Sequence, residues 1–160
     1  MATEQEIFRL EELAYEMRRK LLEFCGSYEG TVHIGGDLSM TDILIALYHY
    51  GLNVDPGNIS MPTRDRFIMS KGHGAFAMYL TMALRGFFDY DKIVRTYGKV
   101  DSAYGMHPCK VHLPGVECSS GSLGHGLAMA AGLAISAKHK NADYRVFCLM
   151  GDGETCEGEV

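Results

Sequence analysis

The sequence has 160 residues, of which 47% are hydrophobic and 22% are charged, and this is the composition of an ordinary globular domain. Its 15 Lys and Arg and 20 Asp and Glu give a net charge of -5 and no basic cluster, which argues against nucleic acid as a partner. No apolar run approaches the ~20 residues of a membrane span, and the five cysteines are irregularly spaced, so we expect a cytoplasmic protein without membrane contact.

Two amphipathic helices are predicted at the start of the chain. Apolar residues recur at steps of three and four from about residue 5 to residue 24, which predicts a helix that Gly26 ends. Ser39 and Asp42 resemble a capping box and predict a second helix that closes at Gly51. Residues 28–38 between them are expected to form a loop.

The remainder of the chain alternates strands and helices. A short strand is expected at 66–69, helices at 75–85 and 90–97, a polar loop at 98–120 and a Gly/Ala-rich helix at 122–140. The apolar run 144–150 predicts a strand covered on both faces. This order predicts one α/β domain over residues 1–160, an open, mostly parallel sheet flanked by helices, with its ligand at the carboxyl ends of the strands.

The most informative motif is Gly151-Asp152-Gly153, at the end of the second predicted strand. Flanking glycines let a diphosphate approach the backbone, and a carboxylate there can hold a hard divalent ion on the phosphate oxygens. The same three residues alone also form a common turn. The position after a strand, with Glu154 and Glu157 behind it, favours a site.

Two further features point to the same edge of the sheet. The glycine group from Gly121 to Gly126 opens a predicted helix, where amide hydrogens can bind an anion or the helix can simply pack closely on a neighbour. His33, His73 and His107 each lie in a loop beside glycine or proline, and imidazoles in converging loops suit proton transfer and the binding of sugar hydroxyls. A single loop histidine is more often structural.

These motifs together resemble the N-terminal, thiamine-diphosphate-binding section of transketolase and its split-subunit relatives. The resemblance runs from about residue 10 to the end of the chain and depends on five segments in the family's order. They are His33-Ile34-Gly35-Gly36, Ser70-Lys71-Gly72-His73, Gly105-Met106-His107-Pro108, Gly121-Ser122-Leu123-Gly124, and Gly151-Asp152-Gly153-Glu154 with Glu157-Gly158. The sequence departs from the family at Val32, where glycine is usual, and at Met106, which separates Gly105 from His107.

The resemblance implies a role for each site residue. Asp152 is expected to bind the Mg²⁺ or Ca²⁺ ion on thiamine diphosphate, and His33 and His107 are expected to be the catalytic, substrate-side histidines. Glu157 resembles the family's acidic residue at the contact between the two cofactor-binding halves, or it is a solvated acid near a helix end. The other expected cofactor-binding residues are His73, Gly121, Leu123 and Gly153.

The implied activity is transfer of a two-carbon ketol unit between sugar phosphates. In the family, the glutamate that activates the cofactor belongs to a pyrimidine-binding section on the same or a separate chain, so we expect a homodimer or heterotetramer. The family's cofactor motif continues past Gly-Asp-Gly to an Asn that this sequence does not reach, and the predicted sheet is left incomplete at Val160. We therefore expect a truncated section without turnover of its own.

Other interpretations of the sequence remain open. A deoxyxylulose-phosphate synthase or a 2-oxoacid dehydrogenase component would also carry Gly-Asp-Gly, although the Ser-Lys-Gly-His and Gly-Ser-Leu-Gly segments favour transketolase. A non-catalytic fragment that retains the fold is a third possibility. A zinc-binding module is a fourth, with His107, Cys109, His112 and Cys118 as ligands, although the paired spacing of zinc motifs is missing.

Overall fold

In this computed structural model, helix α1 (Glu4–Ser27) packs along one side of the molecule through a single apolar face. The helix begins with a capping box, in which the Thr3 hydroxyl accepts a hydrogen bond from the Glu6 N–H and the Glu6 carboxylate accepts one from the Thr3 N–H. Its buried side chains, spaced by three and four residues, are Ala14, Met17, Leu21 and Phe24. The predicted helix is confirmed, but Gly26 does not end it, because the last turn closes at Tyr28, whose N–H donates to the Phe24 carbonyl.

The segment after α1 is more helical than the sequence predicted. Residues 28–38 were expected to form a loop, yet most of α2 (Ile34–Ser39) lies within them, followed by α3 (Thr41–Ala46) and the π-helical turn η1 (Leu47–Gly51). The predicted capping box at Ser39 is wrong. Ser39 ends α2 and its hydroxyl donates to the Gly36 carbonyl, whereas α3 begins after Met40 without a side-chain cap.

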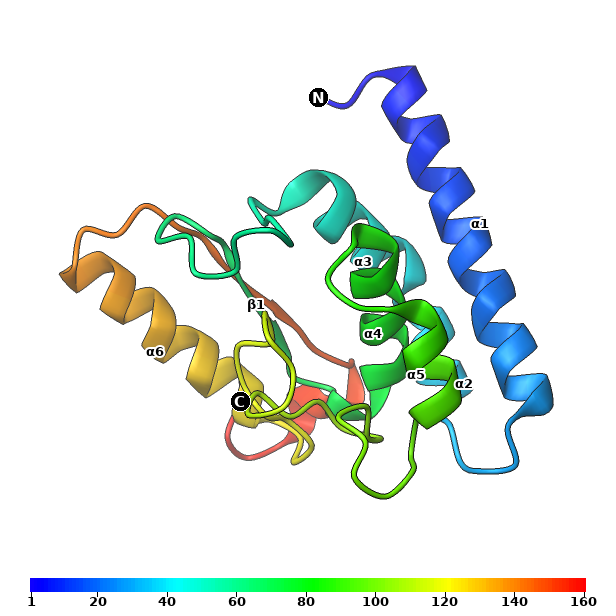
Figure 1. Cartoon of the computed structure of the whole chain (residues 1–160). Coiled ribbons are helices and arrows are strands. Elements are labelled where there is room, and N and C mark those ends of the chain that lie inside the picture. The colour runs from blue at the N-terminus through cyan, green and yellow to red at the C-terminus, as the bar shows by residue number, and fades with distance from the viewer.

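Strands β1 (Arg66–Met69) and β2 (Val146–Leu149) form a parallel pair in which Arg66 lies opposite Val146 and Met69 opposite Leu149. Helix α6 (His125–His139) covers one face of this pair, and α3 and α4 (Ala75–Arg85) lie on the other, with α1 outside them (Figure 1). Helix α5 (Tyr90–Thr96) packs on α4. The predicted α/β fold is confirmed, although α6 begins at His125, three residues later than expected, after Gly124 in the left-handed region (φ 86°).

The apolar core lies on the face of the sheet that α3 and α4 cover, which we call the helical side. A cluster of 23 buried residues joins α1, α3, α4 and α5 to β1, with the rings of Phe24, Phe76 and Tyr97 in mutual contact at its centre. The expectation that the second strand is covered on both faces is wrong for this chain, because every residue of β2 is only half-buried. On α6, Ile135 is 57% exposed.

The structure describes all residues from 1 to 160, and none of its helices combines the length and the apolar composition that crossing a membrane requires. The long segment between α5 and α6 carries no helix or strand, as predicted. It runs past the carboxyl ends of both strands, where two short 3₁₀ turns, η2 (Gly72–Gly74) and η3 (Gly153–Cys156), follow β1 and β2.

Candidate functional site

The carboxyl ends of β1 and β2 lie side by side and bring two of the predicted motifs together. The strands are parallel and in register, and the Ser70 N–H continues the ladder by donating to the Leu149 carbonyl at 2.9 Å. The segments 70–73 and 150–153 therefore leave the sheet at the same edge. We call this part of the molecule, together with the 120–126 and 33–39 segments that contact it, the strand-end edge.

The three loop histidines lie around this edge. The rings of His33 and His73 have centroids 5.3 Å apart. The ring of His73 packs on Gly36 and the ring of His107 packs on Gly121. In each case a Cβ added to the glycine would lie 3.3 Å from Cδ2 of the histidine. Burial lowers the pKa of His73, repulsion from the Lys71 ammonium lowers it further, and the Glu154 carboxylate acts in the opposite direction. His73 is therefore held in its neutral form, which suits hydrogen bonding to a ligand.

Asp152 lies at the start of η3 with an exposed side chain. It precedes the first helical residue but makes no side-chain capping bond, so its carboxylate is free to bind a ligand. No three His, Cys, Asp or Glu side chains are grouped so that they could hold a metal ion. This argues against the zinc module that His107, Cys109, His112 and Cys118 suggested.

The glycine-containing segments 70–73 and 120–126 approach each other very closely. A Cβ on Gly72 would lie 2.6 Å from the carbonyl carbon of Ser120, so the 70–73 and 120–126 segments touch through their main chains. Leu123 is half-buried beside them, whereas Gly153 is exposed with nothing within 4 Å of a Cβ. Glu157 is exposed, and its Cβ would lie 3.0 Å from a Cβ on Gly124.

Lys71 joins the histidine loops to the strand ends, a role that no pattern in the sequence indicated. Its ammonium donates to the Ser39 hydroxyl at 3.0 Å and to the Gly36 carbonyl at 3.4 Å, and the residue is only 8% exposed. Burial lowers the pKa of Lys71, while the negative charges of Asp37, Glu154 and Asp152 act in the opposite direction. The only signal along the chain was the place of Lys71 between Ser70 and Gly72.

Two carboxylates at this edge are buried and bonded in a way that the sequence did not indicate, although Glu154 itself belongs to a predicted motif. Asp37 of α2 is fully buried and accepts a hydrogen bond at 3.0 Å from the Ala77 N–H, in the first turn of α4. Glu154 of η3 is 3% exposed and accepts hydrogen bonds from residues of the other segments. Neither sequence position indicates these partners, because they are 30 or more residues away along the chain.

Several polar atoms at the edge have no partner within the chain. Nδ1 of His33 and the hydroxyl of Ser120 are both buried without a hydrogen bond. Such atoms are uncommon in native proteins and mark places where a ligand can complete the bonding. With the free carboxylate of Asp152 and the main-chain contacts at Gly72 and Gly121, they fit a polar, phosphate-bearing molecule.

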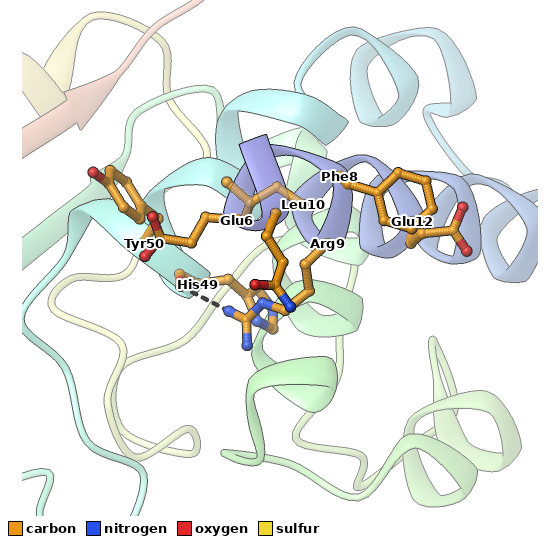
Figure 2. A pocket seen from close by; sticks show the side chains of 8 residues that line it. Glu6, Phe8, Arg9, Leu10, Glu12, His49 and Tyr50 are labelled. Carbon is orange, nitrogen blue, oxygen red and sulfur yellow. Dashed lines mark hydrogen bonds between the residues drawn. The ribbon is translucent and has the colours of Figure 1, made fainter. Parts of the chain in front are cut away.

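A separate hollow of about 520 Å³ lies far from these residues, between the beginning of α1 and η1. Figure 2 shows Arg9 reaching across it to donate a hydrogen bond to the His49 carbonyl at 3.2 Å. None of the side chains that line it belongs to the strand-end edge. The predicted site residues therefore gather at a different place from this hollow.

Comparison with known proteins identifies the family of the chain. The model of the family described as transketolase, thiamine diphosphate binding domain, matches residues 18–160. The chain is 42% identical over 149 residues to one subunit of the apulose-4-phosphate transketolase of Phocaeicola vulgatus, which covers 93% of this chain and 52% of that protein. It is 34% identical over 158 residues to the 6-deoxy-6-sulfo-D-fructose transketolase subunit SqwG of a Clostridium species, covering 99% of this chain and 56% of that one.

Solved structures show the same fold. The transketolase of Leishmania mexicana superposes with a TM-score of 0.84 at 26% identity, covering 99% of this chain and 24% of that one. That of Campylobacter jejuni superposes with a TM-score of 0.82 at 30% identity, covering 93% and 24%. The chain spans about half the length of the curated subunit relatives and about a quarter of these transketolases. The matched residues and the fold together establish that the chain belongs to the transketolase family and corresponds to that family's thiamine-diphosphate-binding domain.

Proposed function

We propose that this chain supplies the diphosphate-binding side of a thiamine diphosphate site in an enzyme that transfers a two-carbon ketol unit between sugar phosphates. The observation that carries the proposal is the meeting of the 33–36, 70–73, 107, 121–124 and 151–153 segments at one edge of a parallel sheet. Parallel α/β sheets bind their ligands at this edge. Residues 1–160 would act as one domain of that enzyme.

The residues at the edge fit the cofactor's diphosphate and a divalent ion. Asp152 would bind Mg²⁺, which commonly uses one or two protein carboxylates together with phosphate oxygens and water, or Ca²⁺ in the same place. Gly121, Leu123 and Gly153 would bring main-chain groups to the diphosphate, and His73 would add a neutral imidazole. Glu157 would lie at the contact with the half that completes the site.

The chemistry is divided between the cofactor and the chain. When bound, thiamine diphosphate supplies the electron sink that carbon–carbon bond cleavage between sugar phosphates requires. His33 and His107 would hold the hydroxyls of the ketose and aldose phosphates and move protons to and from them. The unpartnered Nδ1 of His33 supports this, because it is a buried hydrogen-bonding atom without a protein partner.

We further propose that the site is completed by a pyrimidine-binding section, on the same chain or on a separate subunit, in a homodimer or heterotetramer. The names of two relatives identify them as single subunits of transketolases. The half-buried strand β2 and the 57% exposed Ile135 of α6 provide apolar surface that such a partner could cover. All five cysteines are unpaired, which supports a reducing cytoplasm as its location.

Calorimetry of the purified chain with thiamine diphosphate tests the proposal. Binding is expected with Mg²⁺ and should be lost when the metal is removed by a chelator. Asp152→Asn should weaken binding by about 10- to 100-fold, while thermal unfolding without cofactor stays unchanged because Asp152 is exposed and makes no side-chain bond. Absence of binding at millimolar cofactor, or equal binding by Asp152→Asn, would contradict the proposal.

A further inference from the structure

Glu154 is the side chain that links the three segments proposed to bind the diphosphate. Its Oε1 accepts a hydrogen bond from the Ser70 hydroxyl at 2.5 Å and another from the Gly124 N–H at 2.9 Å. Its Oε2 accepts one from the Gly151 N–H at 3.0 Å. Ser70 follows β1, Gly124 precedes α6, and Gly151 follows β2, so one carboxylate joins three segments that are distant in sequence.

The chemistry of these contacts requires a carboxylate. An ionised Glu is an acceptor on both oxygens, and here each of its three partners is a donor. A glutamine of the same shape would turn its NH₂ group toward at least one of these donors and lose that hydrogen bond. An aspartate is one methylene shorter, so it could not reach both Gly124 and Gly151 from the same main-chain position.

The burial of Glu154 agrees with this bonding. The side chain is only 3% exposed, and both of its carboxylate oxygens accept hydrogen bonds from donors within the chain. A buried charge with its hydrogen bonds complete fixes its partners more firmly than a neutral group does.

Each bonded group is a near neighbour of a residue proposed to bind the cofactor. Gly151 precedes Asp152, Gly124 follows Leu123, and Ser70 begins the segment that ends at His73. The 70–73 and 120–126 segments are also in tight contact, because a Cβ on Gly126 would lie 2.6 Å from Cα of Ser70. Any displacement of Glu154 therefore moves the metal-binding carboxylate relative to the other diphosphate-binding groups.

We propose that Glu154 is a positioning residue, whose buried carboxylate holds the 70–73, 121–124 and 150–153 segments in the arrangement that binds thiamine diphosphate, without contacting the cofactor itself. This rests on the proposed function of the same edge. Small displacements of binding groups cost large factors in affinity and rate, so the loss of one hydrogen bond of this set should be measurable.

The experiment compares Glu154→Gln with Glu117→Gln in the whole chain. Glu117 is a matched control because it is a second largely buried glutamate, paired with Arg64 and Arg66 at the other end of β1. Hydrogen exchange of the Gly124 and Gly151 amides, followed by NMR without cofactor, reports the hydrogen bonds directly. Calorimetry with thiamine diphosphate and Mg²⁺ reports the binding site.

Glu154→Gln should speed exchange at Gly124 or Gly151 by about 10-fold and weaken cofactor binding by about 10- to 100-fold, as expected for a residue that orients metal ligands. Exchange in α4 should stay unchanged. Glu117→Gln should lower thermal stability without altering either glycine amide or the affinity. Should Glu154→Gln fail to fold, Ser70→Ala removes one donor only and is expected to weaken binding by roughly 2- to 10-fold.

The possible results separate the two proposals. Unchanged exchange at both glycine amides, or faster exchange with unchanged affinity, would overturn the positioning role while the proposed function stands. A wild-type chain that binds no thiamine diphosphate would overturn the proposed function and the positioning role together. In that case the exchange data would still show whether Glu154 holds the three segments.

Discussion

Phe76 and Glu154 are both buried, but different kinds of contact hold them. Phe76 is fully buried on the helical side, with its ring centroid 4.2 Å from that of Phe24 and 4.8 Å from that of Tyr97. Glu154 lies at the strand-end edge and is held by hydrogen bonds to Ser70, Gly124 and Gly151. The helical side is thus stabilised by apolar area, whereas the strand-end edge is shaped by a few polar contacts.

The difference teaches how stability and function are divided in this domain. Apolar packing is non-directional and tolerates small shifts, so it suits a region whose task is to hold the fold. Hydrogen bonds to buried carboxylates depend on direction and distance, so they suit a region whose groups must meet a ligand in a set geometry. Substitutions on the two sides should therefore differ both in size and in what they change.

The largest expected effect is on the helical side. Phe76→Ala should reduce the free energy of unfolding by about 3–5 kcal/mol, because it removes a fully buried ring and leaves a cavity between Phe24 and Tyr97. Phe8→Ala is the matched control, since Phe8 is 63% exposed on α1 and its loss should change stability by no more than about 0.5 kcal/mol. Urea denaturation measures both. Equal losses would show that the face of α1 carrying Phe8 is covered in solution.

A smaller, pH-dependent effect is expected at Asp37, where the two regions meet. Burial raises the pKa of Asp37 from an ordinary 3.8 to about 6. The hydrogen bond from the Ala77 N–H and the positive charge of Lys71 lower this pKa, but they offset only part of the effect of burial. The folded state therefore binds the Asp37 proton more tightly than the unfolded chain does.

The sign of the effect follows from this difference. The contribution of Asp37 is fully present below about pH 4, where the carboxyl is protonated in both states, and it is lost as the pH rises through about 6. Wild type should thus lose about 2–3 kcal/mol relative to Asp37→Asn between pH 4 and pH 7. Urea denaturation of both proteins across this range measures the difference. A difference that does not vary with pH would mean that the Asp37 pKa is not raised.

Regular periodicity made the helical side predictable. The three- and four-residue spacing found α1, and α4 and α5 came out at almost their predicted bounds, because apolar faces decide where such helices form. The same reasoning missed α2, since Gly35 and Gly36 indicate a turn. Tertiary contacts hold this short helix instead, namely the Lys71 ammonium on the Gly36 carbonyl and Asp37 on the Ala77 N–H.

The strand-end edge was predictable in its residues but not in its contacts. The motifs identified His33, His73, Gly121 and Asp152, and the structure brings their segments together. The bonding of Glu154 could not be predicted, because its partners at residues 70 and 124 become neighbours only when the strands pair. The half-buried state of β2 also escaped prediction, since an apolar run does not reveal what covers it.

The smallest effect tests whether the outer face of α6 is exposed in solution, by making the same substitution at two places in this helix. Gly132 has nothing within 4 Å of a Cβ, so Gly132→Ala should stabilise the chain by about 0.5–1 kcal/mol through the better helix propensity of alanine. Gly126 in the same helix is its control, because a Cβ there would lie 2.3 Å from the Ser70 hydroxyl, and Gly126→Ala should cost roughly 1–3 kcal/mol. Thermal or urea unfolding gives both values. A loss of stability on Gly132→Ala would mean that another chain packs closely on this face of α6 in solution, so that the outer face of α6 would be exposed only in the isolated chain.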